Sequence, residues 1–167
     1  MRLAIGDKVI YPSQGPCLVN VPVKKVIDGS SVSFYHLALL DGSGGELFVP
    51  VDKVRSIGIR RLLKRTEIPK LLGLLKQTVQ IDKNWKQRGI DNHKRLSTGS
   101  AFDLAEIVES LTELMGTRAL SFRESWMLSK ARKLLVCEIA EVMHEPISAA
   151  EQQVDEALKA RTSDNKK

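Results

Sequence analysis

The spacing of apolar residues changes once along this chain, close to Gly58. Before that point, short runs of β-branched and aromatic residues alternate with turn formers, which is typical of strands. After it, apolar residues recur every three or four positions, which is typical of amphipathic helices. The pattern therefore predicts two domains of different class. The expected strands are Lys8–Tyr11, Cys17–Ile27, Val32–Leu40 and Glu46–Val51, with Lys53–Ile57 as a candidate fifth.

Residues 1–59 are expected to form a small Tudor-like or SH3-like antiparallel β-barrel. Asp28-Gly29 lies between two of the predicted strands, and glycine tolerates the positive φ that a tight hairpin needs. Several short antiparallel strands in succession usually close into a barrel of this kind. This region therefore predicts the β part of a two-domain α+β fold.

Residues 60–160 are expected to form a compact domain of four or five helices, and residues 161–167 a disordered polar tail. Ser100 with Asp103, and Ser121 with Glu124, have the spacing of N-terminal capping motifs. The other helices are expected to begin at a cap on Thr66, to span about Lys83–Leu96, and to span Ala149–Ala160 after Pro146.

Positive charge is concentrated in the middle of the chain. The 167 residues carry 26 Lys and Arg against 20 Asp and Glu, a formal net charge of +6. Residues 60–99 hold eleven basic and three acidic groups, a net of +8, whereas residues 1–59 carry +1 and residues 100–167 carry −3. A concentration of this kind predicts a local contact with an anionic partner such as nucleic acid, although a solvated helix face would give the same count.

The motifs of common enzyme classes are missing from the sequence. The glycine cluster Gly42–Gly45 lies between two expected strands and not before a helix, so it does not fit a phosphate-binding loop. The three histidines are scattered, and Cys17 and Cys137 lie far apart, which gives no metal ligand set and no disulfide framework. We therefore expect no enzyme activity, no cofactor and no metal. No membrane span or signal peptide is evident, so we expect a cytoplasmic protein.

The two tryptophans have different settings. Trp85 begins the most basic and least apolar helical segment, and Trp126 lies beside apolar residues where packing in the helical core is favoured. At helical spacing one side of the basic segment presents an aromatic ring with amide and cationic groups, which suits a DNA duplex that is beginning to open. The alternative is that Trp85 fills the helical core and the cations only solvate the surface. The predicted DNA-binding side comprises Trp85, Arg88, Asn92 and Arg95, flanked by Lys86 and Lys94.

The sequence resembles the CarD/CdnL bacterial transcription regulators, which bind RNA polymerase. The likeness runs from about residue 3 to residue 143, and the opening motif alone is also similar to the polymerase-binding module of transcription-repair coupling factors. The residues that carry the resemblance are Ile5–Gly15, Val49-Pro50 with Val54, Ser56–Arg60, Asn84-Trp85 with Arg88, Gly99-Ser100, Ala105–Val108, and Leu120–Glu124 with Met127-Leu128 and Ala131-Arg132.

The resemblance implies a regulator whose N-terminal domain docks on the β subunit of RNA polymerase. We expect the protein to be monomeric. Its helical domain would touch promoter DNA at the upstream edge of the −10 bubble and stabilise the open complex. Trp85 matches the family's wedge tryptophan, Arg88 matches a cation beside the DNA, and Arg95 falls on a basic position. The positions that match the polymerase contact are Lys25, Phe48 and Pro50.

The sequence departs from the family at a few of these positions. Phe48 stands where other members have Arg or Met, and Gly89 and Ile90 replace more polar or basic residues after Arg88. The main alternative function is a free-standing, nucleoid-type DNA-binding protein that uses the same basic segment without a polymerase. A structural adaptor between two proteins is a further alternative, whereas a helix-turn-helix repressor lacks a short turn and a base-reading second helix.

Overall fold

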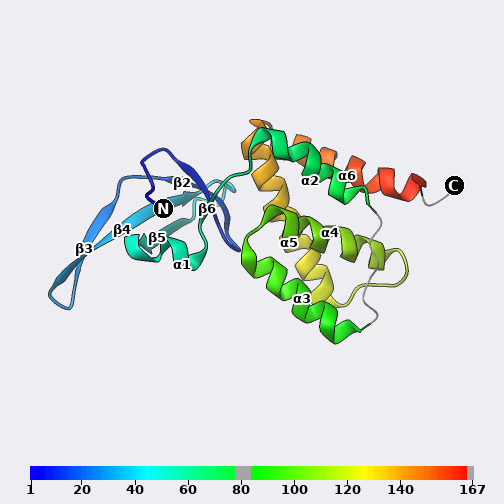
Figure 1. Ribbon diagram of the computed structural model, residues 1–167, viewed down its shortest axis with the longest axis horizontal. Coiled ribbons are helices and arrows are strands. Elements are labelled where there is room, and N and C mark those ends of the chain that lie inside the picture. The colour runs from blue at the N-terminus through cyan, green and yellow to red at the C-terminus, as the bar shows by residue number, and fades with distance from the viewer. Residues whose placement is uncertain (78–83, 165–167) are drawn as a thin grey trace. The chain divides into compact units, whose positions relative to one another are not determined.

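The computed structural model describes residues 1–77 and 84–164, and it divides the chain into two compact units, Met1–Leu62 and Leu63–Lys167 (Figure 1). The division expected after residue 59 lies three residues earlier than this one. Arg60 and Arg61 form strand β6, which pairs with β1 and so belongs with the first unit. Within the described ranges, no helix has the length and apolar character needed to cross a membrane.

The first unit is an antiparallel sheet built around one long strand, β4. Strands β2 and β3 follow one another along one edge of β4, and β5 pairs with it from Phe34 to Ala38. Strand β1 joins β2 to β6. The strands are β1 (Lys8–Tyr11), β2 (Gly15–Val19), β3 (Val23–Ile27), β4 (Ser30–Leu39), β5 (Glu46–Pro50) and β6 (Arg60–Arg61). The antiparallel β part of the predicted fold is thus confirmed.

Two of the expected strands were wrong in detail. Cys17–Ile27 is broken into β2 and β3, because Pro22 has no amide hydrogen to continue the ladder along β4. Lys53–Ile57 is not a strand. A 3-10 turn η1 (Val51–Lys53) leads into the short helix α1 (Val54–Ile57), which ends at Gly58 with a left-handed φ of 88°.

The hairpin expected at Asp28-Gly29 is confirmed. Ile27 and Ser30 are paired across it, and both turn residues have positive φ, 51° and 79°. This is the conformation of a two-residue type I′ turn, whose twist matches that of the flanking strands. The turn joins β3 to β4 and fixes their register.

The two faces of β4 have different surroundings. Tyr35 and Leu37 point into the core of the first unit, whereas Phe34 and His36 alternate with them on the other face. The outward face of β4 continues onto β3 and β5 at the paired positions. The core comprises Leu3, Val9, Cys17, Val19, Tyr35, Leu37, Val49, Val54 and Ile59.

The second unit is helical, which confirms the other part of the fold class. Helix α4 packs against α2, α3 and α5, and α6 packs against α2 and α5 (Figure 1). Its large apolar core is drawn mainly from α4 and α5. The elements are η2 (Arg65–Glu67), α2 (Ile68–Leu75), α3 (Trp85–Thr98), α4 (Ala101–Met115), α5 (Phe122–Met143) and α6 (Ile147–Asp164).

The capping motifs at Ser100 and Ser121 are confirmed. Each hydroxyl accepts a hydrogen bond from the amide three residues later, and the Ser121 amide donates one to the Glu124 carboxylate. The cap expected on Thr66 is wrong. A 3-10 turn occupies that position, the Lys64 amide donates to Glu67 at 2.7 Å, and α2 begins at Ile68.

The disordered tail expected from residue 161 was also wrong at its start, because α6 continues to Asp164. Arg161 is only 2% exposed. Its guanidinium donates to the backbone carbonyl of Glu109 and forms an ion pair with Glu113, which ties the end of α6 to α4. A buried ion pair therefore orders a segment whose composition is polar. Residues 165–167 lie outside the described residues.

Candidate nucleic-acid interface

Helix α3 begins at the tryptophan that the sequence singled out. The Asn84 side chain accepts hydrogen bonds from the amides of Lys86 and Gln87, at 3.0 and 3.3 Å, so Trp85 is the first helical residue. The helix ends at Gly99, which has a left-handed φ of 75°. Trp85 is 68% exposed. The alternative in which this indole fills the helical core is therefore wrong.

The side of α3 that carries Trp85 becomes buried further along the helix. Leu96 and Asn92 are buried, the Arg88 side chain is 13% exposed, and Trp85 at the first turn is open. These positions share one side because they are three or four residues apart. The side predicted to face DNA is thus the side that packs on α4, and only its N-terminal end is available to a partner.

Asn92 was predicted on the DNA-binding side, but its side chain is not open to a partner. It is 5% exposed, and its side-chain oxygen accepts a hydrogen bond from Arg95 Nη1 at 3.1 Å. Arg95 also forms an ion pair with Glu106, with 2.9 Å between Nε and Oε2. These contacts join the end of α3 to α4, so they account for both residues as packing contacts.

The two lysines of the predicted set are exposed. Lys86 Nζ lies 5.5 Å from the centroid of the Trp85 ring, a cation–π geometry that keeps a positive charge beside the indole. Lys94 is exposed and has no acidic partner among the residues that the structure describes. The predicted six residues therefore separate into an exposed group, Trp85, Lys86 and Lys94, and a packed group, Arg88, Asn92 and Arg95.

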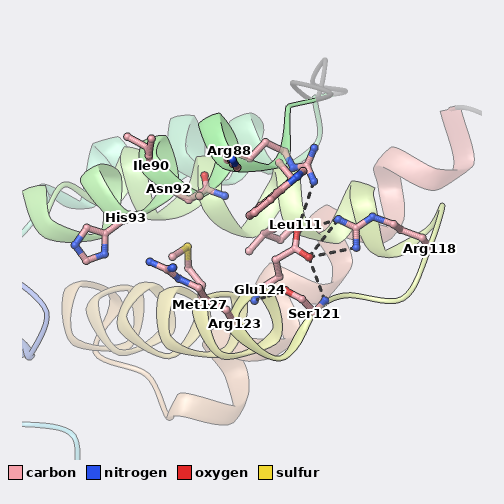
Figure 2. Close-up of a pocket in the computed structure, with 13 residues that line it drawn as sticks. Arg88, Ile90, Asn92, His93, Leu111, Arg118, Ser121, Arg123, Glu124 and Met127 are labelled. Atoms are coloured by element: carbon pink, nitrogen blue, oxygen red, sulfur yellow. Dashed lines mark hydrogen bonds and ion pairs between the residues drawn. The ribbon is translucent and has the colours of Figure 1, made fainter.

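A pocket of about 790 Å³ opens beside Trp85, between α3 and the start of α5 (Figure 2). Leu111 of α4 and Met127 of α5 provide apolar surface, and Figure 2 shows Arg123 and Met127 extending from α5 toward α3. The other lining residues are Trp85, Lys86, Arg88, Gly89, Ile90, Asn92, His93, Arg118, Ser121 and Glu124.

One carboxylate organises the cations at the end of this pocket. Glu124 accepts hydrogen bonds from Arg118 at 3.2 Å, and its Oε2 lies 3.9 Å from Arg88 Nη2 (Figure 2). Burial acts to raise the pKa of Glu124, but hydrogen bonds from the Ser121 amide and hydroxyl and from Arg118 hold it below its ordinary value of 4.5. Glu124 is therefore ionised at neutral pH and fixes both guanidinium groups.

Positive charge exceeds negative charge around the pocket. Lys86, Arg88, Arg118 and Arg123 face one carboxylate, Glu124, so these side chains carry a net charge of +3. Arg123 is exposed and has no acidic partner in the described part of the chain. The sequence prediction missed Arg118 and Arg123 because they lie in the segment with a net charge of −3. The sequence could have indicated these two cations, because they lie on either side of Ser121, the capping residue that begins α5.

The basic segment 60–99 does not correspond to one element of the fold. Arg60 and Arg61 form β6 in the first unit, Lys70 lies on α2, and Lys86 and Lys94 lie on α3. Lys83 falls outside the described residues. The net charge of +8 therefore overstates the charge that any single helix presents.

The three residues predicted to contact a polymerase share the outward face of the β4–β5 pair and its neighbour β3. Phe48 is 44% exposed and stacks on His36, with 4.8 Å between the ring centroids. Lys25 Nζ lies 4.8 Å from the Phe48 ring. Pro50 is paired with Phe34 on the same face. The structure thus brings these residues into one aromatic and cationic surface, here called the β5 surface: Lys25, Phe34, His36, Phe48 and Pro50.

Trp126 was expected in the core, and this expectation was wrong. Trp126 is 53% exposed, and Phe122, one turn earlier on α5, is 90% exposed. Met127 and Ala131 are buried, and successive helical residues are rotated by about 100°. Trp126 therefore lies outside the buried side of α5 although its neighbour in sequence lies within it.

Comparison with known proteins now places the chain. Residues 70–155 match the family model of the CarD C-terminal domain. This chain belongs to the CarD family. Residues 3–63 match the CarD-like/TRCF RID domain. This second match covers the β unit, and the first lies in the helical unit. As a member of this family, the chain is a transcription regulator of the CarD/CdnL type.

Two individual proteins are similar to this CarD-family chain. A Bacillus subtilis (strain 168) protein named "Putative transcription factor YdeB" is 26% identical over 137 residues, which cover 81% of this chain and 88% of the relative. The solution NMR structure of the 72-residue N-terminal domain of Myxococcus xanthus CarD is 37% identical. That match covers 36% of this chain and 79% of that domain, with a TM-score of 0.31.

Proposed function

We propose that this CarD-family regulator binds the β subunit of RNA polymerase through its β unit and stabilises the promoter open complex through Trp85. The indole would occupy the minor groove at the upstream fork of the −10 bubble. The observation that carries the proposal is that Trp85 is 68% exposed at the first turn of α3, beside the cation of Lys86. A large aromatic ring held in solvent at the start of a cationic helix is suited to stacking on an opened base step.

The energetics favour DNA that is already open. Unstacking a base step costs a few kcal/mol, whereas stacking on an aromatic side chain returns about 1 to 3 kcal/mol. The ring therefore gains most where the step is already separated. A ligand shifts an equilibrium only by its differential affinity for the two states, and 1.4 kcal/mol of preference for open DNA changes the ratio about tenfold.

The match of residues 3–63 to the CarD-like/TRCF RID domain supports a contact with RNA polymerase. We infer that the β5 surface makes this contact, because it is the exposed face where Lys25, Phe48 and Pro50 come together. Phe48 replaces the Arg or Met of other members. Its ring stacks on His36, so the polymerase would contact a flat aromatic ring in place of a flexible side chain. The contact would therefore depend more on aromatic packing than on one cation.

Attachment to the polymerase makes a weak DNA contact sufficient. A covalent link between a bound module and a second module gives the second an effective concentration of about 1 mM at its site. The helical unit then needs only modest, sequence-independent affinity for the fork. Specificity for promoters would come from the polymerase, which selects where the β unit docks.

The decisive experiment compares two exposed tryptophans of the same unit. Trp85→Ala should leave binding to polymerase unchanged and shorten the lifetime of the open complex by about 5- to 150-fold, the equivalent of 1 to 3 kcal/mol of lost stacking. Trp126→Ala is the matched control, because that indole is 53% exposed on α5 and does not line the pocket. An open-complex lifetime that is equal in wild type and Trp85→Ala would reject the wedge.

The docking surface is tested separately. Phe48→Asp and Lys25→Glu should each abolish recovery of the β subunit in a pull-down, because they place negative charge on the β5 surface. Affinity for forked DNA should persist in both variants. Recovery of the β subunit by both variants at the wild-type level would place the docking surface elsewhere on the molecule.

A further inference from the structure

The pocket beside Trp85 has a composition that a wedge alone does not explain. We propose that it binds one unpaired nucleotide, with the base on its apolar surface and the phosphate on the cations at its rim. This inference rests on the proposed function. Trp85 would hold a base step open, and the nucleotide next to that step would bind in the pocket. Its volume of about 790 Å³ lies within the range of ligand sites in proteins, about 300 to 1,000 Å³.

The apolar part of the pocket fits the faces of a nucleobase. Leu111 and Met127 lie on the α4 and α5 sides, and Gly89 and Ile90 lie on the α3 side. Leu111 and Met127 are only 1% and 4% exposed, so they close the floor of the pocket. The apolar surface open to a base is that of Ile90 and Trp85, which are 62% and 68% exposed. Ile90 adds apolar surface to the pocket, and Gly89 leaves space beside it.

The charged part of the pocket fits a phosphate. Glu124 holds Arg118 and Arg88 in place, while Arg123 remains exposed without an acidic partner in the described chain. Lys86 adds a second exposed cation on the opposite helix. The net charge of +3 favours an anion, and the carboxylate that would repel it is neutralised by two guanidinium groups. An apolar floor with cations at the rim matches a nucleotide and not a neutral apolar ligand.

Gly89 allows the pocket to be filled without disturbing the helix. A Cβ added at Gly89 would meet no atom within 4 Å, and the residue has an ordinary helical backbone without positive φ. A leucine there would therefore extend into open space at the pocket wall. Gly89→Ala is the matched control, since it adds one methyl group and raises helix propensity in the same direction as leucine does.

The test measures binding of the full chain to forked DNA by fluorescence anisotropy, with and without a base at the first unpaired nucleotide. Wild type and Gly89→Ala should bind the fork with 2-aminopurine at that position at least about fivefold more tightly than the fork with an abasic nucleotide there. Gly89→Leu should bind both forks equally, at the affinity of the abasic fork. Arg123→Gln should weaken binding to both forks, because it removes a phosphate contact and leaves the base site intact.

Equal binding of the two forks by wild type would overturn the proposal, as would wild-type discrimination in Gly89→Leu. The abasic comparison needs only the wild-type chain, so a Gly89→Leu variant that failed to fold would not prevent a decision. Displacement of the fork by dAMP at micromolar concentration would assign the pocket to a free nucleotide and reject the strand as its source. A shortened open-complex lifetime in Trp85→Ala, with no base dependence at the fork, would remove the pocket proposal alone and leave the wedge standing.

Discussion

Loss of Arg161, near the C-terminal end of α6, should strongly destabilise the helical unit. Arg161 is 2% exposed and connects α6 to α4 through three contacts. The guanidinium pairs with Glu113 at 2.5 Å, donates to the backbone carbonyl of Glu109 at 3.1 Å, and lies 4.0 Å from the Glu109 carboxylate. Arg161→Met keeps much of the apolar volume and removes all three contacts.

The size of the loss follows from the burial of Arg161 and Glu109, whose side chains are 3% and 2% exposed. Removing one member of a buried ion pair typically costs about 3 to 5 kcal/mol, because the other charge remains buried without compensation. Burial already raises the pKa of Glu109 to about 7, even though Arg161 acts to lower it. For a unit of about 100 residues this loss corresponds to a fall in melting temperature of about 12 to 20 °C.

The titration of Glu109 sets the direction in which stability changes with pH. The pKa of Glu109 is raised from 4.5 to about 7, so the folded state binds the proton more tightly than the unfolded state does. The resulting stability is fully present below pH 4.5 and is lost as the pH rises through about 7, an effect of about 3 kcal/mol for a group that is 1% exposed. Arg161→Met should raise this pKa further, so its cost should be greater at pH 8 than at pH 6.

The assay is urea unfolding of wild type, Arg161→Met and Glu109→Gln between pH 5 and pH 8. Glu109→Gln removes the titrating group and should flatten the loss of stability between pH 5 and pH 8 relative to wild type. Parallel pH profiles for wild type and Glu109→Gln would refute the reasoning about the buried carboxyl. A cost below about 1 kcal/mol for Arg161→Met at pH 8 would show that α6 is held by its apolar contacts alone.

Two further predictions concern smaller, local effects. Asn84→Ala should lower the free energy of unfolding by about 1 kcal/mol, because it removes the acceptor of the Lys86 and Gln87 amides at the start of α3. Faster amide hydrogen exchange at those two residues would detect the loss. Burial raises the pKa of the Cys17 thiol to about 11. Cys17 should therefore react with a thiol reagent at pH 8 only after denaturant is added. Prompt reaction of Cys17 in the native protein would contradict the burial of this thiol.

The parts of the fold that were predicted correctly are those with a local chemical cause. The hairpin at Asp28-Gly29 depends on two residues that adopt positive φ, and the helix starts at Ser100 and Ser121 depend on hydroxyl groups three residues before an acidic side chain. Each signal is contained in a few adjacent residues. Such signals survive folding because no distant partner is needed to produce them.

The errors at the candidate site and at the end of α6 concern residues whose setting depends on a distant partner, whereas those at Thr66 and Lys53–Ile57 were local. Spacing placed Trp85 and Asn92 on one side of α3, but it could not show that α4 covers only the far end of that side. Arg161 belongs to a polar stretch, and only the fold reveals the acidic groups of α4 that bury it. Trp126 lies beside buried residues in sequence, yet it points away from them around the helix.

The pairing of the cations gives a test that separates the proposed polymerase-attached regulator from a free-standing DNA-binding protein. Arg88 and Arg95 are engaged by Glu124 and Glu106, so the cations of α3 and the pocket that lack an acidic partner, among described residues, are Lys86, Lys94 and Arg123. Three phosphate contacts give a slope of about −2.7 for log affinity against log salt. Affinity should then fall about 40-fold between 50 and 200 mM salt, whereas six to ten contacts would lower it about 10³- to 10⁵-fold.

A slope near −3 for log affinity against log salt, measured for the isolated chain on duplex DNA, would fit a helix that depends on attachment to the polymerase. About three ionic contacts give little affinity on their own. A slope near −4.5 would mean that Arg88 and Arg95 also leave their carboxylates to reach phosphates, because five contacts at about −0.9 each give that value. Glu106→Gln separates these cases, because it frees Arg95. If Arg95 is held away from DNA in the wild type, the variant should steepen the slope by about one unit. An unchanged slope would refute the account of Arg95 as a cation that Glu106 holds away from DNA.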